Sequence, residues 1–128
     1  MNSYKYFNEN PINKQVGDCT VRAISVVLNQ PWEKTYIDLM VQGFILCDMP
    51  SANRVWGEYL IKKGFERYPI KCIDFCDYTV KDFCIDNPKG VYILATSGHV
   101  IAVIDGCYYD TWDSGEELPL YYWQKRKD

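Results

Sequence analysis

The fold is decided by the segment His99-Val-Ile-Ala-Val-Ile-Asp-Gly-Cys-Tyr-Tyr-Asp-Thr-Trp112. Two runs of β-branched and aromatic residues flank Asp105-Gly106, and this dipeptide is a strong local signal for a two-residue β-hairpin. Such a turn pairs Ile104 with Cys107 and places Asp110 diagonal to His99 on one face of the sheet. A three-residue turn would reverse the parity and favour Asp113, so both aspartates remain candidates beside His99.

The segments around this hairpin predict further strands and, before them, helices. Asp18 is a suitable N-cap for a first helix, Pro31 opens a second, and Ser51 caps a third. The predicted helices are 19–28, 32–46, 52–63 and 79–85, and the predicted additional strands are 67–75, 90–96 and 120–123. Helices followed by an antiparallel meander indicate an α+β fold, with N-terminal helices packed on a C-terminal antiparallel sheet. Residues 1–17 are expected to form an irregular arm.

Composition limits the possible functions. The 128 residues predict a single domain, 1–128, and the 48% hydrophobic content is enough for a real core. The net charge of −3 argues against a nucleic-acid partner. The polar N-terminus lacks a secretory signal, and the longest uncharged run, about fourteen residues, is too short for a membrane span. We therefore expect a cytoplasmic protein with reduced thiols (in the host cytoplasm if it is phage-encoded). The sequence leaves the oligomeric state open.

Six cysteines and a single histidine set the possible site chemistry. Cys72, Cys76 and Cys84 form no Cys-x-x-Cys pair, so we expect no metal site. The chain has no phosphate-binding or dinucleotide-binding glycine motif, so we expect no cofactor.

Cys19 and His99 are the candidate reactive residues. Cys19 begins a helix, where the free N–H groups and the helix dipole favour a thiolate. His99 opens a strand, and an aspartate on the return strand would orient its imidazole. Together they predict a Cys–His–Asp arrangement. Arg22 is expected to pair with Asp18, four residues earlier.

Gly17-Asp-Cys-Thr-Val-Arg-Ala-Ile24, then Gly98-His-Val100 and an aspartate on the return strand, resembles the papain-like cysteine peptidase superfamily. Compact bacterial and phage-type members are most similar, including the bacteriocin-processing and transglutaminase-like branches. The Cys-Gly-Ser/Ala-Cys-Trp signature of papain itself is absent, and residues 32–88 match only as helices between Cys and His. The resemblance implies a papain-like fold with Cys19 as nucleophile, His99 as base and Asp110 as orienting residue. It also implies an oxyanion-hole amide before the cysteine, for which Gln15 and Asn13 are candidates.

The leading hypothesis is a cysteine hydrolase, a peptidase or amidase, that acts on a peptide or protein substrate through a thioacyl intermediate. One alternative is an acyl transferase of the transglutaminase-like type, in which an amine replaces water. Another is a non-catalytic binding or inhibitory phage-type protein on the same scaffold, because a fold does not dictate function.

Overall fold

A computed structural model of the chain describes residues 3–71 and 77–126. Its described part is an α+β fold, as predicted, with four helices and a six-stranded sheet. The helices are α1 (Cys19–Leu28), α2 (Trp32–Leu46), α3 (Asn53–Lys62) and α4 (Val80–Asp86). The strands are β1 (Tyr4–Tyr6), β2 (Phe65–Pro69), β3 (Val91–Ala95), β4 (Val100–Ile104), β5 (Cys107–Asp110) and β6 (Tyr121–Lys125).

The predicted hairpin is formed by β4 and β5, the third and second strands of a sheet whose order is β1-β5-β4-β3-β6-β2. Ile104 pairs with Cys107, as the two-residue turn requires. Asp105 and Gly106 both have positive φ, 49° and 76°, which is the backbone that turns of type I′ need. The register prediction is therefore confirmed, and with it the position of Asp110 at the end of β5.

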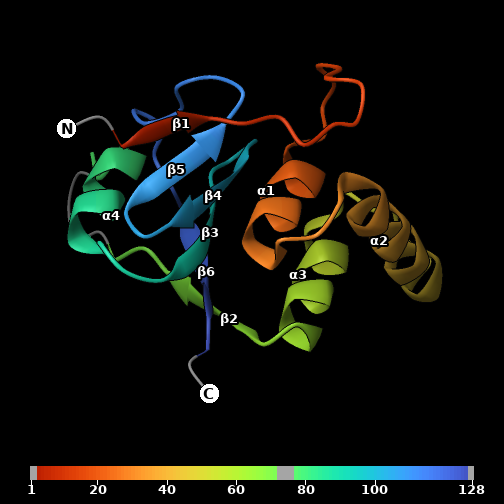
Figure 1. Ribbon diagram of the computed structural model, residues 1–128. Helices are drawn as coiled ribbons and strands as arrows, with labels where there is room; N and C mark the ends of the chain where they lie inside the picture. Colours follow the sequence, from red (N-terminus) through yellow and green to blue (C-terminus); the bar gives the residue numbers. More distant parts are fainter. Residues whose placement is uncertain (1–2, 72–76, 127–128) are drawn as a thin grey trace.

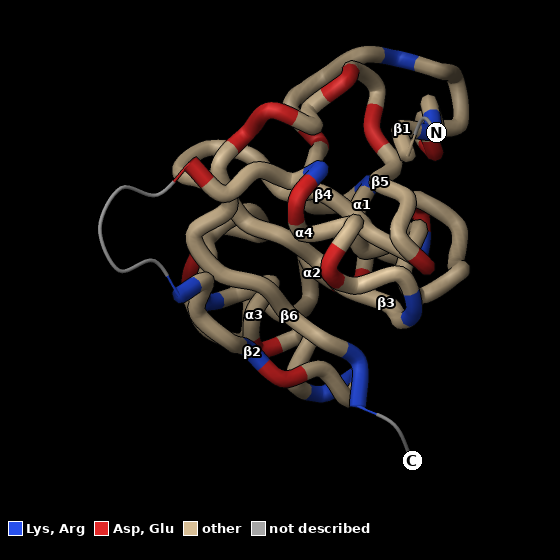
Figure 2. The backbone as a smooth tube through the Cα atoms, turned by 90° about the vertical axis from the view of Figure 1, so that its left-hand side faces the viewer, with Lys and Arg blue, Asp and Glu red and all other residues tan. Residues whose placement is uncertain are grey.

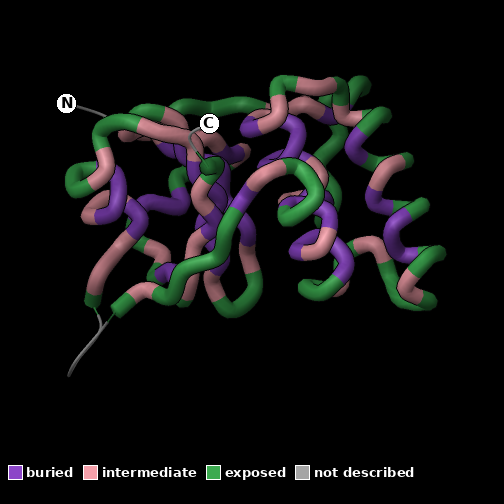
Figure 3. Tube along the Cα trace, turned by 90° about the horizontal axis from the view of Figure 1, so that it is seen from below, coloured by how far each residue is buried: buried purple, intermediate pink, exposed green. Residues whose placement is uncertain are grey.

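Helices cover both faces of this sheet (Figure 1). α1 and α3 pack on one face against alternate strand residues that include Ile93 and Ala102. α4 packs on the other face, against the intervening residues that include Leu94 and Ile101. Figure 3 shows buried positions along the sheet and along the helix sides that face it. The near-continuous apolar runs of β3 and β4 follow from this burial on two faces.

The sheet is mixed rather than purely antiparallel, because β1 pairs in parallel with β5. The expectation of an irregular arm over residues 1–17 is therefore wrong for Tyr4–Tyr6. The edge strand is held at both ends: Tyr108 N donates to Ser3 O at 3.0 Å, and Phe7 N donates to Asp110 O at 3.0 Å. A three-residue edge strand whose partner lies about a hundred residues away carries little local signal.

The bounds of β2 and the start of α3 also differ from the predicted ones. The strand expected over 67–75 begins at Phe65 and ends at Pro69, because it pairs with β6 along its whole length. Residues 72–76 of that prediction lie outside the described part of the chain. α3 has Ala52, not Ser51, at its N-cap, and no side chain caps it. α4, in contrast, has a full capping box between Thr79 and Asp82.

α2 lies at the edge of the helical layer, beyond α1 and α3 (Figure 1). Leu39 of α2 is buried, whereas Tyr36 and Met40 of the same helix are about half exposed. A Cβ atom on Gly43 would lie 2.7 Å from the backbone oxygen of Asp48, so glycine permits the close passage of the chain after α2.

Charged residues of both signs are spread over the elements seen in Figure 2. Basic residues at the β2–β6 edge lie near acidic ones, as in the pair Arg126–Glu66, whose N–O distance is 3.8 Å. This pairing at an exposed edge contributes little to stability.

Candidate active site

Cys19, His99 and Asp110 meet at one end of the sheet. Cys19 is the first residue of α1, which packs along β4. His99 comes immediately before Val100, the first residue of β4, and Asp110 is the last residue of β5. Because β4 and β5 are antiparallel, the start of one and the end of the other lie together, and the N-terminus of α1 reaches the same place.

Asp110 holds the imidazole of His99 on one side. His99 Nε2 lies 2.6 Å from Asp110 Oδ2. The side chains of His99 and Asp110 are only 12% and 2% exposed. Ser114 Oγ donates to Asp110 Oδ2 at 2.7 Å, and Thr111 N donates to Oδ1 at 2.8 Å. Burial raises the pKa of Asp110, but the hydrogen bonds from His99 and Ser114 outweigh it and lower that pKa below its ordinary value.

Cys19 interacts with the same imidazole. Burial alone would raise the pKa of the Cys19 thiol, yet its hydrogen bonds with His99 and with the Val100 backbone, together with the charge of His99, lower it overall. Burial alone would lower the pKa of His99, yet its hydrogen bonds to Asp110 and to Cys19 raise it to about 9. Since Nε2 faces Asp110, Nδ1 is the nitrogen left for the thiol.

The lowered pKa of the Cys19 thiol and the raised pKa of the His99 imidazole both favour a thiolate–imidazolium pair over the neutral pair. The negative thiolate and the positive imidazolium stabilise each other because both are partly buried, and the Asp110 carboxylate stabilises the imidazolium through its other nitrogen. A thiolate is the nucleophilic form of cysteine, and an imidazolium can return a proton to a leaving group. The arrangement is therefore suited to covalent attack on an electrophilic carbon.

Arg22 connects the start of α1 with Asp110. As predicted, its guanidinium pairs with Asp18, and its other terminal nitrogen, Nη2, lies 3.4 Å from Asp110 Oδ1. Asp18 was expected to cap α1, but its side chain makes no cap hydrogen bond. Its second oxygen accepts from Trp32 Nε1 at 2.9 Å instead. A buried cation between two carboxylates thus ties the first turns of α1 to the end of β5.

The alternative aspartate lies elsewhere. Asp113 accepts hydrogen bonds from the Tyr108 hydroxyl and, at 3.1 Å, from Gly115 N. Because the hairpin turn has two residues, Asp110 and not Asp113 is beside His99.

The two amides expected to contribute to an oxyanion hole lie on the exposed arm before α1. Asn13 has a left-handed backbone, with φ of 55°, and its side-chain oxygen accepts from Asn8 Nδ2 at 3.2 Å. Among the described residues, neither Asn13 nor Gln15 makes a hydrogen bond to Cys19 or His99. The arm is folded by Asn10, whose side-chain oxygen accepts from Ile12 N and Lys14 N at 3.1 and 3.2 Å. The oxyanion role of either amide stays a prediction.

Trp112 covers the imidazole. Its ring centroid lies 5.0 Å from that of His99 at an interplanar angle of 34°. The side chain is 45% exposed, so it forms part of the outer wall of the site and not of the core. It shields the His99–Asp110 contact from water, which strengthens that contact.

Two residues near the site have no signal in the sequence. Ser114 is fully buried and donates a hydrogen bond to Asp110. It lies in a loop that contains Gly and Asp, and this composition predicts only a turn. Glu9 lies in the arm, and both of its carboxyl oxygens are buried without a hydrogen-bond partner among the described residues. Burial raises the pKa of Glu9 to about 7, partly offset by the nearby charge of Arg22.

The remaining cysteines contribute no second reactive cluster within the described ranges. Cys19, Cys47, Cys84 and Cys107 are free thiols, and burial raises the pKa of Cys84 to about 12. In residues 3–71 and 77–126, no group of three or more His, Cys, Asp or Glu side chains is arranged so that it could hold a metal ion. Cys72 and Cys76, considered above with Cys84 as a metal cluster, lie outside the described residues.

Comparisons of this chain with family models, with curated proteins and with solved structures find no match. The described helices include none with the length and apolar character needed to cross a bilayer. Function must therefore be argued from the geometry of the site itself.

Proposed function

We propose that the protein is a papain-like cysteine hydrolase that cleaves an amide bond in a peptide or protein substrate. The observation that carries the proposal is the contact of 2.6 Å between His99 Nε2 and Asp110 Oδ2, with Cys19 interacting with the same imidazole. A cysteine activated by a histidine that a third group orients is the arrangement that covalent catalysis requires.

The reaction follows from these positions. The Cys19 thiolate attacks the carbonyl carbon of the substrate, forming a C–S bond and moving an electron pair to the carbonyl oxygen. The free N–H groups at the start of α1 stabilise that developing negative charge. The imidazolium of His99 gives its proton to the amine as the C–N bond breaks. His99 then takes a proton from water, which attacks the thioacyl carbon and releases Cys19 and a carboxylic acid.

The papain-like assignment is supported by how the chain builds this site. The cysteine starts a helix that packs on the sheet, the histidine precedes a strand, and the aspartate ends the next strand. This is the chain order on which the resemblance of the sequence to the papain-like superfamily rests. The cytoplasm, where thiols stay reduced, is the compartment we propose for such a site.

Selective alkylation tests the proposal. The protein is treated briefly with iodoacetamide at pH 6.5, and each cysteine is quantified by peptide mass spectrometry. An ordinary thiol is only about 1% ionised at this pH. We expect Cys19 to react about tenfold or more faster than the exposed Cys47, even after allowing for the weaker nucleophilicity of a low-pKa thiolate. Equal rates for Cys19 and Cys47 would sink the proposal.

Two variants complete this test. His99→Ala is expected to slow alkylation of Cys19 and leave Cys47 unchanged, whereas Asp113→Asn, which changes a carboxylate that does not face His99, leaves both unchanged.

If the protein cleaves a peptide library, adding a primary amine separates hydrolysis from acyl transfer: hydrolysis yields only the free acid, and transfer yields the new amide.

A further inference from the structure

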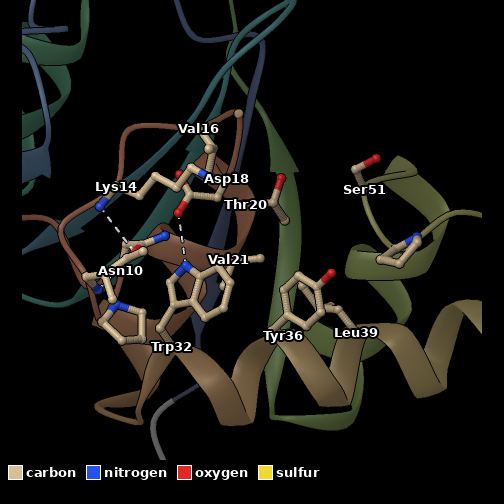
Figure 4. Close-up of a pocket in the computed structure, with 14 residues that line it drawn as sticks. Asn10, Lys14, Val16, Asp18, Thr20, Val21, Trp32, Tyr36, Leu39 and Ser51 are labelled. Atoms are coloured by element: carbon tan, nitrogen blue, oxygen red, sulfur yellow. Dashed lines mark hydrogen bonds between the residues drawn. The ribbon is translucent and has the colours of Figure 1, made fainter.

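A cavity of about 630 Å³ lies along the first turns of α1, on the side of the helix that faces α2, and Cys19 itself is not among the residues that line it. Its walls come from the arm before α1, from the first turns of α1 and α2, and from the loop after α2 (Figure 4). Gly17, Asp18 and Thr20, the residues on either side of Cys19 in the chain, line it. A ligand held in this cavity therefore lies next to the first turn of α1, where Cys19 is placed.

The walls are apolar and already ordered. Trp32 and Tyr36 stack with ring centroids 4.9 Å apart, and Leu39 lies behind them, fully buried. Opposite them, the arm presents Ile12 and Val16, which are 78% and 44% exposed. Apolar side chains held toward solvent around a cavity are typical of a binding site for an apolar group, and the volume is in the range of small-ligand pockets.

The charges at the cavity select the type of apolar ligand. Asp18 is the carboxylate of the lining, and it is already bound by Arg22 and by Trp32 Nε1. Lys14 is the lysine of the lining, and within the described residues it forms no ion pair. The cavity thus offers a cation without a counter-ion and no unpaired carboxylate, which favours an anionic ligand and disfavours a basic one.

We propose that this cavity binds the C-terminal residue of a peptide substrate, with a large apolar side chain against Trp32 and Tyr36 and the free carboxylate near Lys14. The inference rests on the proposed function and deepens it: the bond attacked by Cys19 is the one before that residue, and the apolar amino acid is the leaving group. The attack forms the C–S bond on the acyl side, and the proton from His99 goes to the nitrogen of the departing residue.

Binding of N-acetylphenylalanine, which resembles the C-terminal residue but requires no chemistry, tests the proposal. Its dissociation constant is measured at low salt from the NMR shift of the Trp32 indole N–H, which a Trp32→Phe variant assigns. N-acetylglycine, which lacks the side chain, is expected to bind about tenfold or more weakly. N-acetylphenylalaninamide, which lacks the charge, is expected to bind about two- to fivefold more weakly, because Lys14 is exposed.

Variants of Lys14 separate charge recognition from simple apolar binding. Lys14→Gln is expected to remove the preference for the carboxylate over the amide, and Lys14→Arg to retain it. Lys5→Gln, at an exposed lysine on β1, is the matched control and keeps the preference. Equal binding of the phenylalanine and glycine compounds, or an unchanged carboxylate preference in Lys14→Gln, would overturn the proposal.

Protection of Cys19 connects the cavity with the reaction. Saturating N-acetylphenylalanine is expected to slow iodoacetamide alkylation of Cys19 severalfold and to leave Cys47 unaffected. Unchanged alkylation of Cys19 in the saturated protein would overturn the assignment of the ligand as a substrate residue. If the ligand binds but Cys19 is never alkylated selectively, the proposed function itself fails, and the assignment of the ligand as a substrate residue fails with it.

Discussion

Replacing Asp110 by asparagine removes the negative charge behind His99 while keeping the shape of the side chain. Asp110 is 3% exposed and bonds directly to the imidazole, so water cannot replace it. The sequence contains one histidine, and the NMR titration of its ring protons therefore reports on this site alone. The prediction is that the pKa of His99 falls markedly in Asp110→Asn.

The magnitude follows from the interactions of the imidazole. A pKa of about 9 for His99, against an ordinary value of about 6.5, corresponds to about 3 kcal/mol in favour of the imidazolium. Burial works against this shift, and the hydrogen bond and charge of Asp110 are the main interactions that raise the pKa, followed by those of Cys19. We therefore expect Asp110→Asn to lower the pKa of His99 by about one unit or more.

The sign of the effect on stability is set by the same shift. A histidine whose folded pKa is raised stabilises the protein fully below about pH 6.5, and this stabilisation is lost as the pH rises through about 9. Asp110→Asn is therefore expected to cost more free energy of unfolding at pH 6 than at pH 10. Measuring both proteins in a Cys19→Ala background removes the coupled titration of the thiol.

The control is Asp113→Asn, because this carboxylate faces Tyr108 and not His99. It is expected to leave the titration of His99 unchanged. The reasoning is refuted if His99 of the unaltered protein titrates near pH 6.5, or if Asp110→Asn and Asp113→Asn shift it equally.

Three further predictions concern the groups around Asp110. Arg22→Ala leaves the buried carboxylates of Asp18 and Asp110 without their shared cation, so the free energy of unfolding measured in urea is expected to fall by about 3 kcal/mol or more. Arg22→Lys is expected to restore only part of this loss. Ser114→Ala removes a buried donor to Asp110 and is expected to cost about 1–2 kcal/mol in the same measurement; a cost below about 0.3 kcal/mol would contradict the buried hydrogen bond. Glu9→Gln is expected to stabilise the protein by up to about 3 kcal/mol above pH 7 and to have no such effect below about pH 4.5. The reason is that the pKa of Glu9 is raised to about 7 in the folded state, so ionising this carboxyl costs free energy only there. Equal stability of Glu9→Gln and the unaltered protein at pH 8 would show that the Glu9 carboxylate is solvated.

Local signals predicted most of the fold. The bounds of α1 and α2 match the predicted ranges, because Asp18 and Pro31 precede apolar runs that break at Asn29 and after Leu46. The hairpin register followed from the backbone that Asp105-Gly106 adopts, and this register placed Asp110 within reach of His99.

Long-range competition accounts for the features that local patterns did not predict. Asp18 is a residue type that commonly caps helices, but its two carboxyl oxygens bind Arg22 and Trp32 instead. β1 pairs with the free edge of β5, and although its residues Tyr-Lys-Tyr alternate, a segment of three residues is too short to indicate a strand. Ser114 supports Asp110 through a loop whose path depends on the whole sheet. The cavity along α1 combines segments that lie about forty residues apart in the sequence, from Asn10 to Ser51.

Cys19, the proposed nucleophile, stands 80 residues before His99 and 91 before Asp110 in the chain. Closing loops of this length is a late and entropically costly event in folding. Until β4 and β5 have paired and docked on α1, the thiol has no imidazole beside it and behaves as an ordinary, mostly protonated cysteine. If the proposed function holds, Cys19 of an incompletely folded chain is therefore expected to react no faster than an ordinary cysteine. The rate at which Cys19 becomes susceptible to alkylation after dilution from denaturant is then expected to report how fast folding is completed.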